Sequence, residues 1–545
     1  MPKVTIDDRT LEVEAGTNLI DAGLQVGVHI PHYCYHPRLE VVGQCRMCLV
    51  ELEGVPKLQA ACVTQVTRDG MVVRTDTEKV QEAQNGMMEF FLVNHPLDCP
   101  ICDQAGECGL QDYSFKHGQA FSRYQYEDKR TYPGRERIPL GPNVLLNMNR
   151  CIQCTRCVRF THEIQGDGAL GFFNRGGRTE IGIFPGKELD HPLSGNVVDI
   201  CPVGALTSTR FRFAERVWYL DKKPSLCTGC EVGCNITLEH RQGQIRRYKP
   251  RFNPQVNDYW MCDYGRSTHE RYERLPRLAA PRVRTAEGQL KVTGWKDALD
   301  TVQAHLLSRS LEGAVAFLGS GHLTTEEAWL LARIADQIGS PHRTVAVETG
   351  PERNIPNTHG GITGREAAPN RRGAELAGLA TPEGGLTADQ LLNGDGASQC
   401  GVLVVADSDF GAGAHDPEMV ARLRQAKVLI VLGWADTPLA READVALPVA
   451  THAEQEGTYV NVQHRLQAFE RCFPTPGQAR PGTEALADLL SRFDEGWKGV
   501  DGSGGEIFDR MVTELSKEIE ALDGLTWKTL PATGVVLQVE EVQAA

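Results

Sequence analysis

The chain has 545 residues, of which 41% are hydrophobic and 23% are charged, as in ordinary globular proteins of several domains. Its 57 Lys and Arg face 71 Asp and Glu, so the formal net charge is −14. This acidity disfavours non-specific binding to nucleic acid or anionic membranes, and no apolar run approaches the roughly 18 residues of a membrane span. The polar residues 1–10 do not have the layout of a signal peptide. We therefore expect a protein of the cytoplasmic compartment that binds no nucleic acid and reaches a membrane only through partner subunits.

The pattern of residues 1–80 predicts a small α+β domain. Short runs in which apolar and polar residues alternate predict strands, and Thr17 is a candidate N-cap for a helix over 18–25. Three further Cys-containing domains are expected over 81–120, 121–217 and 218–274. The predicted strands of the first domain are 4–6, 11–13, 49–52 and 71–74.

Residues 275–500 have a different pattern, in which short apolar runs alternate with segments of helical spacing. This alternation predicts an α/β domain with a parallel, buried sheet. Many Gly, Pro and Asn residues in 350–398 predict a long surface loop. Residues 501–545 are expected to form a C-terminal tail, with a linker over 501–505 and a helix over 506–521. The predicted strands of the α/β domain are 314–318, 344–347, 402–406 and 428–432, and its predicted helices are 324–338 and 417–425.

Fifteen of the 17 cysteines lie between Cys34 and Cys262, which in a protein that is not secreted indicates metal ligation rather than disulfide bonds. Together with one histidine they form four sets, while Cys400 and Cys472 are expected to be plain buried cysteines. Set 1 is Cys34, Cys45, Cys48 and Cys62; set 2 is His95, Cys99, Cys102 and Cys108; set 3 is Cys151, Cys154, Cys157 and Cys201; set 4 is Cys227, Cys230, Cys234 and Cys262.

Set 1 has the spacing C-x10-C-x2-C-x13-C, which favours a [2Fe–2S] cluster because a tight thiolate pair is joined by two distant thiolates. Its loop residues Gly43, Gln44 and Arg46 would let the backbone wrap closely and direct N–H groups at sulfur. Set 2 has the spacing H-x3-C-x2-C-x5-C. Imidazole can replace thiolate on iron, and because it is neutral it should raise the reduction potential. A four-ligand zinc site remains an alternative for either set.

Set 3 has the spacing C-x2-C-x2-C-x43-C-P, and set 4 has C-x2-C-x3-C-x27-C. Three thiolates two residues apart suit one face of a [4Fe–4S] cluster better than tetrahedral zinc, and the distant Cys201 would complete set 3. Set 4 suits the same cluster, with a structural zinc or a degenerate site without metal as alternatives. Four zinc sites in one short stretch have no evident purpose, whereas several clusters in a row can conduct electrons.

Motifs for substrate chemistry are missing from the sequence. There is no Gly-x-Gly-x-x-Gly after a strand and no Walker sequence, and Leu318-Gly-Ser-Gly321 predicts a turn at a strand end. No catalytic residue is expected. The chain is predicted to relay electrons without binding nicotinamide or quinone itself.

Residues 1–272 resemble the 75-kDa-type iron–sulfur subunits of respiratory complex I, which in bacteria form the G-subunit family of NADH-quinone oxidoreductases. The resemblance rests on His32-Tyr-Cys-Tyr-His36, Gly43-Gln-Cys-Arg-Met-Cys48 and Asn149-Arg-Cys-Ile-Gln-Cys-Thr-Arg-Cys157. It implies a ferredoxin-like β-grasp domain first, one [2Fe–2S] cluster on set 1 and [4Fe–4S] clusters on sets 2 and 3. It also implies electron transfer from a flavin- and NADH-binding subunit towards quinone-site subunits, at the cytoplasmic side of a bacterial cell membrane.

Set 4 resembles an extra [4Fe–4S] cluster of some bacterial members, which is typically off the main path. Glu456-Gly-Thr-Tyr-Val-Asn461 and Arg465-Leu-Gln467 resemble a segment of the molybdopterin oxidoreductase fold, so 275–500 is expected to be a shortened version of it. Active molybdenum enzymes usually have a lysine where this chain has Tyr264, so no molybdopterin is expected. Three rivals remain: a molybdenum or tungsten enzyme such as an NAD-linked formate dehydrogenase, an iron-only hydrogenase, and a zinc-stabilised scaffold.

Overall fold

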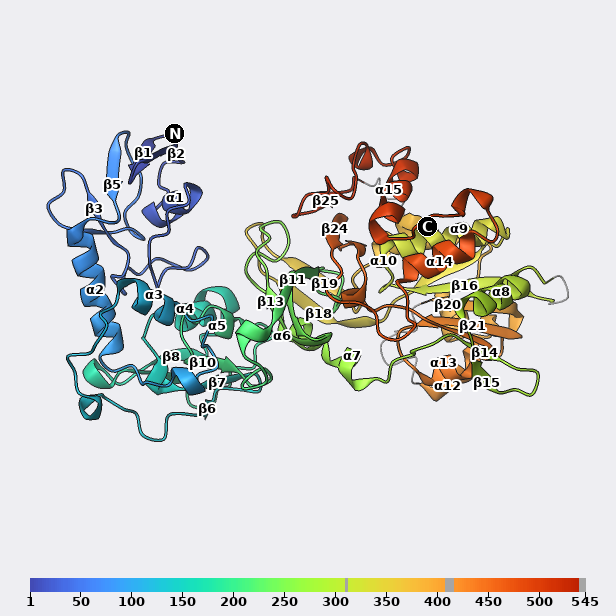
Figure 1. Cartoon of the computed structure of the whole chain (residues 1–545), viewed down its shortest axis with the longest axis horizontal. Coiled ribbons are helices and arrows are strands. Elements are labelled where there is room, and N and C mark those ends of the chain that lie inside the picture. The colour runs from blue at the N-terminus through green and yellow to red at the C-terminus, as the bar shows by residue number, and fades with distance from the viewer. Residues whose placement is uncertain (309–311, 407–415, 539–545) are drawn as a thin grey trace. The chain divides into compact units, whose positions relative to one another are not determined.

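The computed structural model describes residues 1–308, 312–406 and 416–538. It divides into two compact units, the N-terminal unit Met1–Leu220 and the C-terminal unit Asp221–Ala545 (Figure 1). Residues 539–545 of the predicted tail lie outside the described residues. Among the described residues, no helix combines the length and the apolar character that crossing a membrane requires.

The N-terminal unit begins with a five-stranded sheet of order β2-β1-β5-β3-β4, in which β1 and β5 are parallel and the other pairs antiparallel. Alternate strand residues such as Val4, Ile6 and Val73 are fully buried against one another and α1, as the period of two predicted. All four predicted strands are confirmed. The elements are β1 (Lys3–Ile6), β2 (Arg9–Glu12), α1 (Leu19–Gln25), β3 (Leu49–Leu52), β4 (Gln59–Ala60) and β5 (Met71–Arg74).

The predicted cap of α1 was wrong by one residue. The side chain of Asn18 accepts hydrogen bonds from the N–H groups of Ile20 and Asp21, each at 3.0 Å. Thr17 Oγ1 instead donates to the carbonyl of Glu14 at 2.8 Å. Asn and Thr are both good N-cap residues, so the sequence alone does not distinguish two adjacent candidates. The cap is the residue whose side chain accepts from the N–H groups of the first helical turn.

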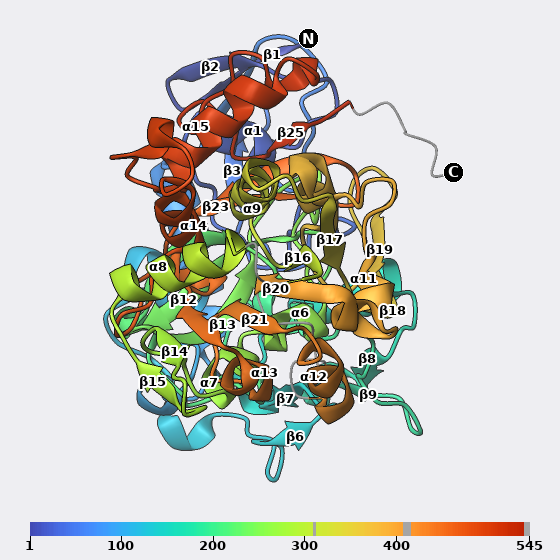
Figure 2. The same ribbon diagram turned by 90° about the vertical axis from the view of Figure 1, so that its right-hand side faces the viewer.

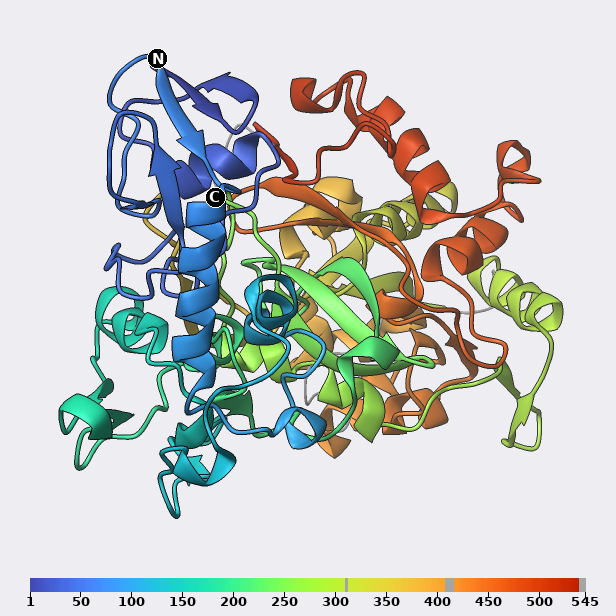
Figure 3. The ribbon, with the colours of Figure 1, turned by 60° about the vertical axis from the view of Figure 1, so that its left-hand side comes forward.

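The rest of the N-terminal unit consists of short elements joined by long loops. Its longest helix, α2, is the long blue helix of Figure 3, and it contacts α3. Two small sheets, β10-β7-β6 and β8-β9, support the loops that carry set 3. The elements are α2 (Glu78–Leu92), α3 (Gly109–His117), β6 (Ile138–Pro139), β7 (Val144–Leu146), α4 (Arg156–Phe160), β8 (Leu170–Phe173), β9 (Glu180–Ile183), α5 (Asn196–Asp199) and β10 (Leu206–Ser208).

The C-terminal unit opens with an antiparallel sheet of order β11-β12-β13, followed by two short helices. Five of the seven residues of β12 are buried, and they lie on both faces of the strand, so both faces of this central strand are largely covered. The elements are β11 (Asp221–Leu226), β12 (Asn235–Arg241), β13 (Gln244–Pro250), α6 (Asp263–Ser267) and α7 (Glu270–Arg274).

A seven-stranded sheet of order β15-β14-β22-β21-β20-β16-β17 forms the core of the C-terminal unit. The five strands from β22 to β17 are parallel, as predicted, and β14 and β15 add an antiparallel edge. The elements are β14 (Arg282–Arg284), β15 (Leu290–Val292), α8 (Trp295–Leu306), β16 (Ala314–Ser320), α9 (Thr325–Gln337), β17 (His342–Ala346), β20 (Cys400–Ala406), α12 (Pro417–Leu423), β21 (Val428–Gly433), α13 (Pro438–Glu442) and β22 (Val445–Pro448).

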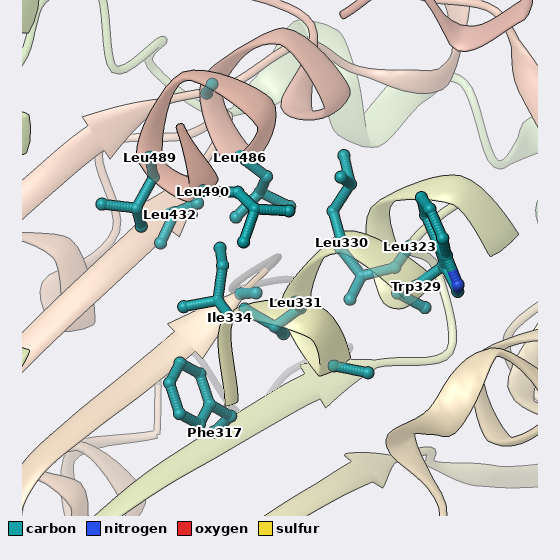
Figure 4. Packing of buried hydrophobic residues seen from close by; sticks show 14 of the residues in the cluster. Phe317, Leu323, Trp329, Leu330, Leu331, Ile334, Leu432, Leu486, Leu489 and Leu490 are labelled. Atoms are coloured by element: carbon teal, nitrogen blue, oxygen red, sulfur yellow. The ribbon is translucent and has the colours of Figure 1, made fainter. Parts of the chain in front are cut away.

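Helices cover both faces of this sheet. Phe317, Val404 and Ile430 belong to one buried cluster with α8, α9, α14 (Gly482–Leu490) and α15 (Gly504–Leu515), while their chain neighbours belong to a second cluster with α12 and α13. Figure 2 shows α8 and α9 on one side of β20 and β21 and α12 and α13 on the other. Figure 4 shows leucines of α9 and α14 above Phe317, with Leu432 of β21 close to Leu490 in this view. Strands buried on both faces explain the continuous apolar runs of the sequence.

Two predictions about the C-terminal unit were wrong. Residues 350–398 contain a hairpin and buried helical turns instead of a surface loop. Within this segment the side chain of Asn370 lies in the interior, where it accepts from the N–H of Val460 and donates to the carbonyl of Leu323. Gly504 and Gly505 of the expected linker form the first turn of α15, which Ser503 caps, and this helix ends at Leu515 rather than at 521. The remaining elements are β18 (Thr349–Ile355), β19 (Ile362–Glu366), α10 (Arg371–Ala374), α11 (Ala388–Leu392), β23 (Gly457–Val460), β24 (Arg465–Phe469) and β25 (Val535–Val536).

Candidate metal centres

All 17 cysteines are free thiols, and of those in the four sets only Cys99 is exposed and Cys151 partly exposed. Cys400 and Cys472 are buried, as predicted. Over residues 1–308, 312–406 and 416–538, no three His, Cys, Asp or Glu side chains are arranged to hold a single ion. A cluster presents several iron atoms, so its ligands need not converge on one point. The sets are therefore described by their mutual contacts.

Set 1 lies in the loops between α1 and β5. The N–H of Cys45 donates to Cys34 Sγ at 3.5 Å, and the N–H of Tyr33 donates to Cys45 Sγ at 3.5 Å. Hydrogen bonds from Cys45 and Cys62 lower the pKa of Cys34. Gly43 and Arg46 have φ of 57° and 55°, so the loop turns tightly around the thiols. Cys48 is hydrogen-bonded to Cys62 and its pKa is also lowered, so this geometry gathers all four members and stabilises thiolate on two of them.

Set 2 lines a cavity of about 460 Å³, to which all four of its residues contribute. His95 follows α2, Cys99 opens a 3₁₀ turn, and Cys108 directly precedes α3. Burial lowers the pKa of His95 to about 4, and the positive charge of Arg150 adds to the effect. The imidazole is therefore neutral near pH 7 and has a nitrogen lone pair to offer.

Set 3 lies where the chain enters α4 and where it leaves α5. Gln153 and Thr155 have φ of 53° and 70°, an uncommon left-handed conformation for side chains other than Gly. These two residues alternate with Cys151, Cys154 and Cys157, and the N–H of Gln153 donates to Cys151 Sγ at 3.3 Å. The strained backbone thus turns around the thiols, as a group bound between them would require.

The loops of sets 1 and 3 are in direct contact. Arg159 on α4 donates to the carbonyl of Cys34, and Arg156 donates to the carbonyls of Tyr35 and Ile200. Each arginine therefore fixes the loop of set 1 to the helix that carries set 3.

The loops of sets 3 and 2 also touch. A Cβ placed on Gly204 would lie 2.2 Å from Cys102 Sγ, so only glycine fits there. The thiol of Cys108 lies 3.8 Å from the carbonyl of Pro202. Because Cys201 directly precedes this segment, the loops of set 3 contact those of both set 2 and set 1.

Set 4 lies in the C-terminal unit, between β11, β12 and α6. The N–H of Cys227 donates to the carbonyl of Cys234 at 2.8 Å, and the N–H of Gly265 donates to Cys262 Sγ at 3.3 Å. A Cβ on Gly265 would lie 3.0 Å from Cys227 Sγ. The absence of a side chain there lets the first turn of α6 approach the thiols.

The thiols of the sets fit iron–sulfur clusters by their electrostatics. Burial, together with the neighbouring Cys154, raises the pKa of Cys201 to about 12. Burial likewise raises the pKa of Cys230 to about 12, with Cys262 adding to it. These buried thiols of sets 3 and 4 are therefore neutral on their own and become thiolates when a cation such as iron binds them.

The spacing of the cysteines identifies the candidate ligands, but it does not identify the residues that hold their loops together. Arg156 and Arg159 stand beside the cysteines of set 3, yet their partners Cys34 and Tyr35 are more than a hundred positions away, at separations of 125 and 121. No spacing rule marks a contact of that kind. The fixed glycine at Gly204 follows Cys201-Pro202, where a close approach of backbone to sulfur could have been suspected.

Five family models match consecutive parts of the chain, and each set lies within one iron–sulfur region. They are "2Fe-2S iron-sulfur cluster binding domain" (2–78), "NADH-ubiquinone oxidoreductase-G iron-sulfur binding region" (84–123), "NADH-quinone oxidoreductase subunit 3, ferredoxin-like domain" (141–207), "Molybdopterin oxidoreductase Fe4S4 domain" (220–274) and "Molybdopterin oxidoreductase" (372–492). Binding domains for 2Fe–2S and 4Fe–4S clusters are therefore present, and the predicted fold class is confirmed.

Curated relatives of the chain are named as the G subunit of NADH-quinone oxidoreductase. The protein of Streptomyces coelicolor is 37% identical over 464 residues, 83% of this chain and 53% of its own length. That of Rickettsia conorii is 41% identical over 63% of this chain and 50% of its own length. A solved structure, "Crystal structure of NAD+-reducing [NiFe]-hydrogenase in the H2-reduced state", aligns at 30% identity and a TM-score of 0.35 over 40% of this chain and 91% of that one. The chain spans about half the length of the curated relatives it matches, and over that part it is similar to the G subunits of NADH-quinone oxidoreductases.

Proposed function

We propose that the chain is the iron–sulfur electron relay of a proton-pumping NADH:quinone oxidoreductase. It carries electrons from the flavin- and NADH-binding subunit towards the quinone-site subunits and performs no substrate chemistry itself. The observation that carries this proposal is the direct contact of the loops of set 3 with those of sets 1 and 2. Electron transfer between clusters needs no bond making, so a protein can relay electrons by holding its clusters close together.

In this proposal set 1 holds a [2Fe–2S] cluster and sets 2, 3 and 4 each hold a [4Fe–4S] cluster. When bound, the clusters supply one-electron transfer. The protein buries the thiolates, excludes water, and directs N–H groups at sulfur, as Gly265 does at Cys262. His95 adds a neutral ligand, which sets the cluster of set 2 apart from the others.

The proposal also gives the chain a position in the complex. The chain is peripheral, on the cytoplasmic side of the bacterial membrane, and is attached through its partner subunits. The names of the curated relatives support attachment to a multi-subunit NADH-quinone oxidoreductase. No molybdopterin takes part, because Tyr264 stands where a lysine is expected in active molybdenum enzymes.

The test is the metal content of the full chain purified without oxygen. We expect iron and acid-labile sulfide in the amounts of one [2Fe–2S] and three [4Fe–4S] clusters, without stoichiometric molybdenum, tungsten or zinc. Cys48→Ala should remove the [2Fe–2S] electron paramagnetic resonance (EPR) signal alone, while Cys400→Ala, a buried cysteine outside the sets, should change none. Colourless protein containing zinc would overturn the proposal.

A further inference from the structure

A buried arginine lies beside set 4 without a hydrogen-bond partner for one of its terminal nitrogens. Arg353 on β18 is 8% exposed, and within the described part of the chain its Nη1 atom has no hydrogen-bond partner. Leaving a buried cation uncompensated is costly, so the position calls for a nearby anion. The question is which group supplies that negative charge.

The side chain of Arg353 is held in place by two neighbours. Its guanidinium carbon lies 4.0 Å from the centre of the Tyr264 ring, a cation–π contact. A Cβ on Gly350 would lie 3.2 Å from Nη2, so the glycine makes room for the guanidinium. Tyr264 belongs to α6, which directly follows Cys262. The stacking therefore fixes the cation against the segment that carries set 4.

Two carboxylates of the neighbouring segments are bound to other groups. Glu231 accepts from Arg372 Nη1 at 2.6 Å and from the N–H of Arg365 at 2.7 Å. Glu352, the chain neighbour of Arg353, accepts from the side chain of Arg365 at 2.6 Å. A Cβ on Gly229, the chain neighbour of Cys230, would lie 3.2 Å from the Tyr264 ring, so the cation stacked on that ring lies close to the loop of set 4.

We propose that Arg353 is the charge-compensating residue of the cluster bound by set 4, and that it raises the midpoint potential of that cluster. The inference rests on the proposed function. A cluster gains one negative charge on reduction, so a fixed cation beside its thiolates stabilises the reduced form more than the oxidised form. The cation reaches the site from β18, about ninety positions beyond Cys262 in the chain, and Tyr264 serves as its aromatic platform.

The test is an EPR-monitored redox titration of the full chain, purified without oxygen and loaded with iron and sulfide. Arg353→Gln should shift the midpoint of the set 4 cluster to a lower potential, whereas Arg353→Lys, which keeps the charge, should stay closer to the wild type. Arg365→Gln is the matched control, because Arg365 lies on the paired strand β19 with a side chain that is 69% exposed. It should leave every midpoint unchanged.

Each other outcome is decisive. An unchanged midpoint in Arg353→Gln overturns the inference. If Arg353→Gln loses the cluster, retention by Arg353→Lys supports a requirement for charge, while loss from both overturns it in favour of a packing role. A wild-type chain with signals from sets 1 to 3 but none from set 4 overturns this inference and leaves the electron relay standing. Loss of all clusters from the wild type would overturn the proposed function.

Discussion

At the scale of single residues, burial determines what each imidazole can do. His95 shares a cavity with three thiols, and His452 lies in the interior of the C-terminal unit with its Nε2 atom 3.1 Å from the Tyr248 hydroxyl. Burial lowers the pKa of both, to about 4 and about 3. Both are therefore neutral at physiological pH, one as a candidate ligand and the other as a packed core residue.

His95→Cys should lower the midpoint potential of the set 2 cluster. A thiolate would replace a neutral imidazole, so both oxidation states become more negative and the reduced state is destabilised more. A redox titration followed by EPR measures the shift. His117→Cys adds the same thiol on α3, outside set 2, and should leave the potential unchanged. An identical titration for His95→Cys and the wild type would remove His95 from the ligands.

His452→Gln should make the C-terminal unit less sensitive to acid. The unfolded histidine takes up a proton below about pH 6.5, but the folded one does so only near its lowered pKa of about 3, so stability falls as pH decreases below 6.5. Between pH 7 and pH 5 the wild type should lose about 2 kcal/mol through this residue. Glu326, whose pKa burial raises to about 7, acts in the opposite direction in both proteins, so the difference between them is the measure.

Denaturant unfolding at several pH values, followed by tryptophan fluorescence, provides the comparison, because six of the seven tryptophans lie beyond residue 220. His359→Gln is the control, since this histidine is exposed. Equal pH dependence in His452→Gln and the wild type would show that His452 does not stay neutral in the fold.

At the scale of elements, the sequence predicted best where burial and periodicity agree. The strands β16, β20 and β21 were found because each is an apolar run that is largely buried on both faces. The segment 350–398 was misjudged because Gly, Pro and Asn usually mark loops, whereas here Asn370 satisfies backbone groups inside the core. Composition cannot distinguish a solvated amide from a buried one that is fully hydrogen-bonded.

Thr324→Ala should destabilise the C-terminal unit by about 1 to 2 kcal/mol. Thr324 is fully buried, its hydroxyl accepts from the N–H of Glu327 at 3.0 Å, and Glu327 in return accepts from the N–H of Thr324 at 2.7 Å. Alanine leaves a buried N–H unpaired. Denaturant unfolding measures the loss. Thr387→Ala removes the same capping box from the exposed start of α11 and should cost less, and an equal loss in both variants would contradict the role of burial.

At the scale of the whole molecule, the sequence predicted the members of each set, but their spatial order came only from the fold. Cysteines of one set are mostly close in the chain, so spacing is enough to group them. The order depends on contacts such as Arg159 with Cys34 and Gly204 with Cys102, which join segments far apart in the chain. These contacts join set 3 to both set 1 and set 2, while set 4 belongs to the other unit.

This order predicts unequal effects for two equivalent substitutions. Cys154→Ala removes a ligand from set 3, which contacts both set 1 and set 2, and should abolish electron flow from NADH to quinone in the assembled complex. Because cluster binding is coupled to folding, the substitution should also destabilise the N-terminal unit. Cys230→Ala should retain most of the flow, because set 4 resembles a cluster that is typically off the main path. Oxidation of NADH with a quinone acceptor measures both, with Cys400→Ala as the control for loss of a buried cysteine. Full flow in Cys154→Ala, or none in a normally assembled Cys230→Ala complex, would show that the electrons take another route.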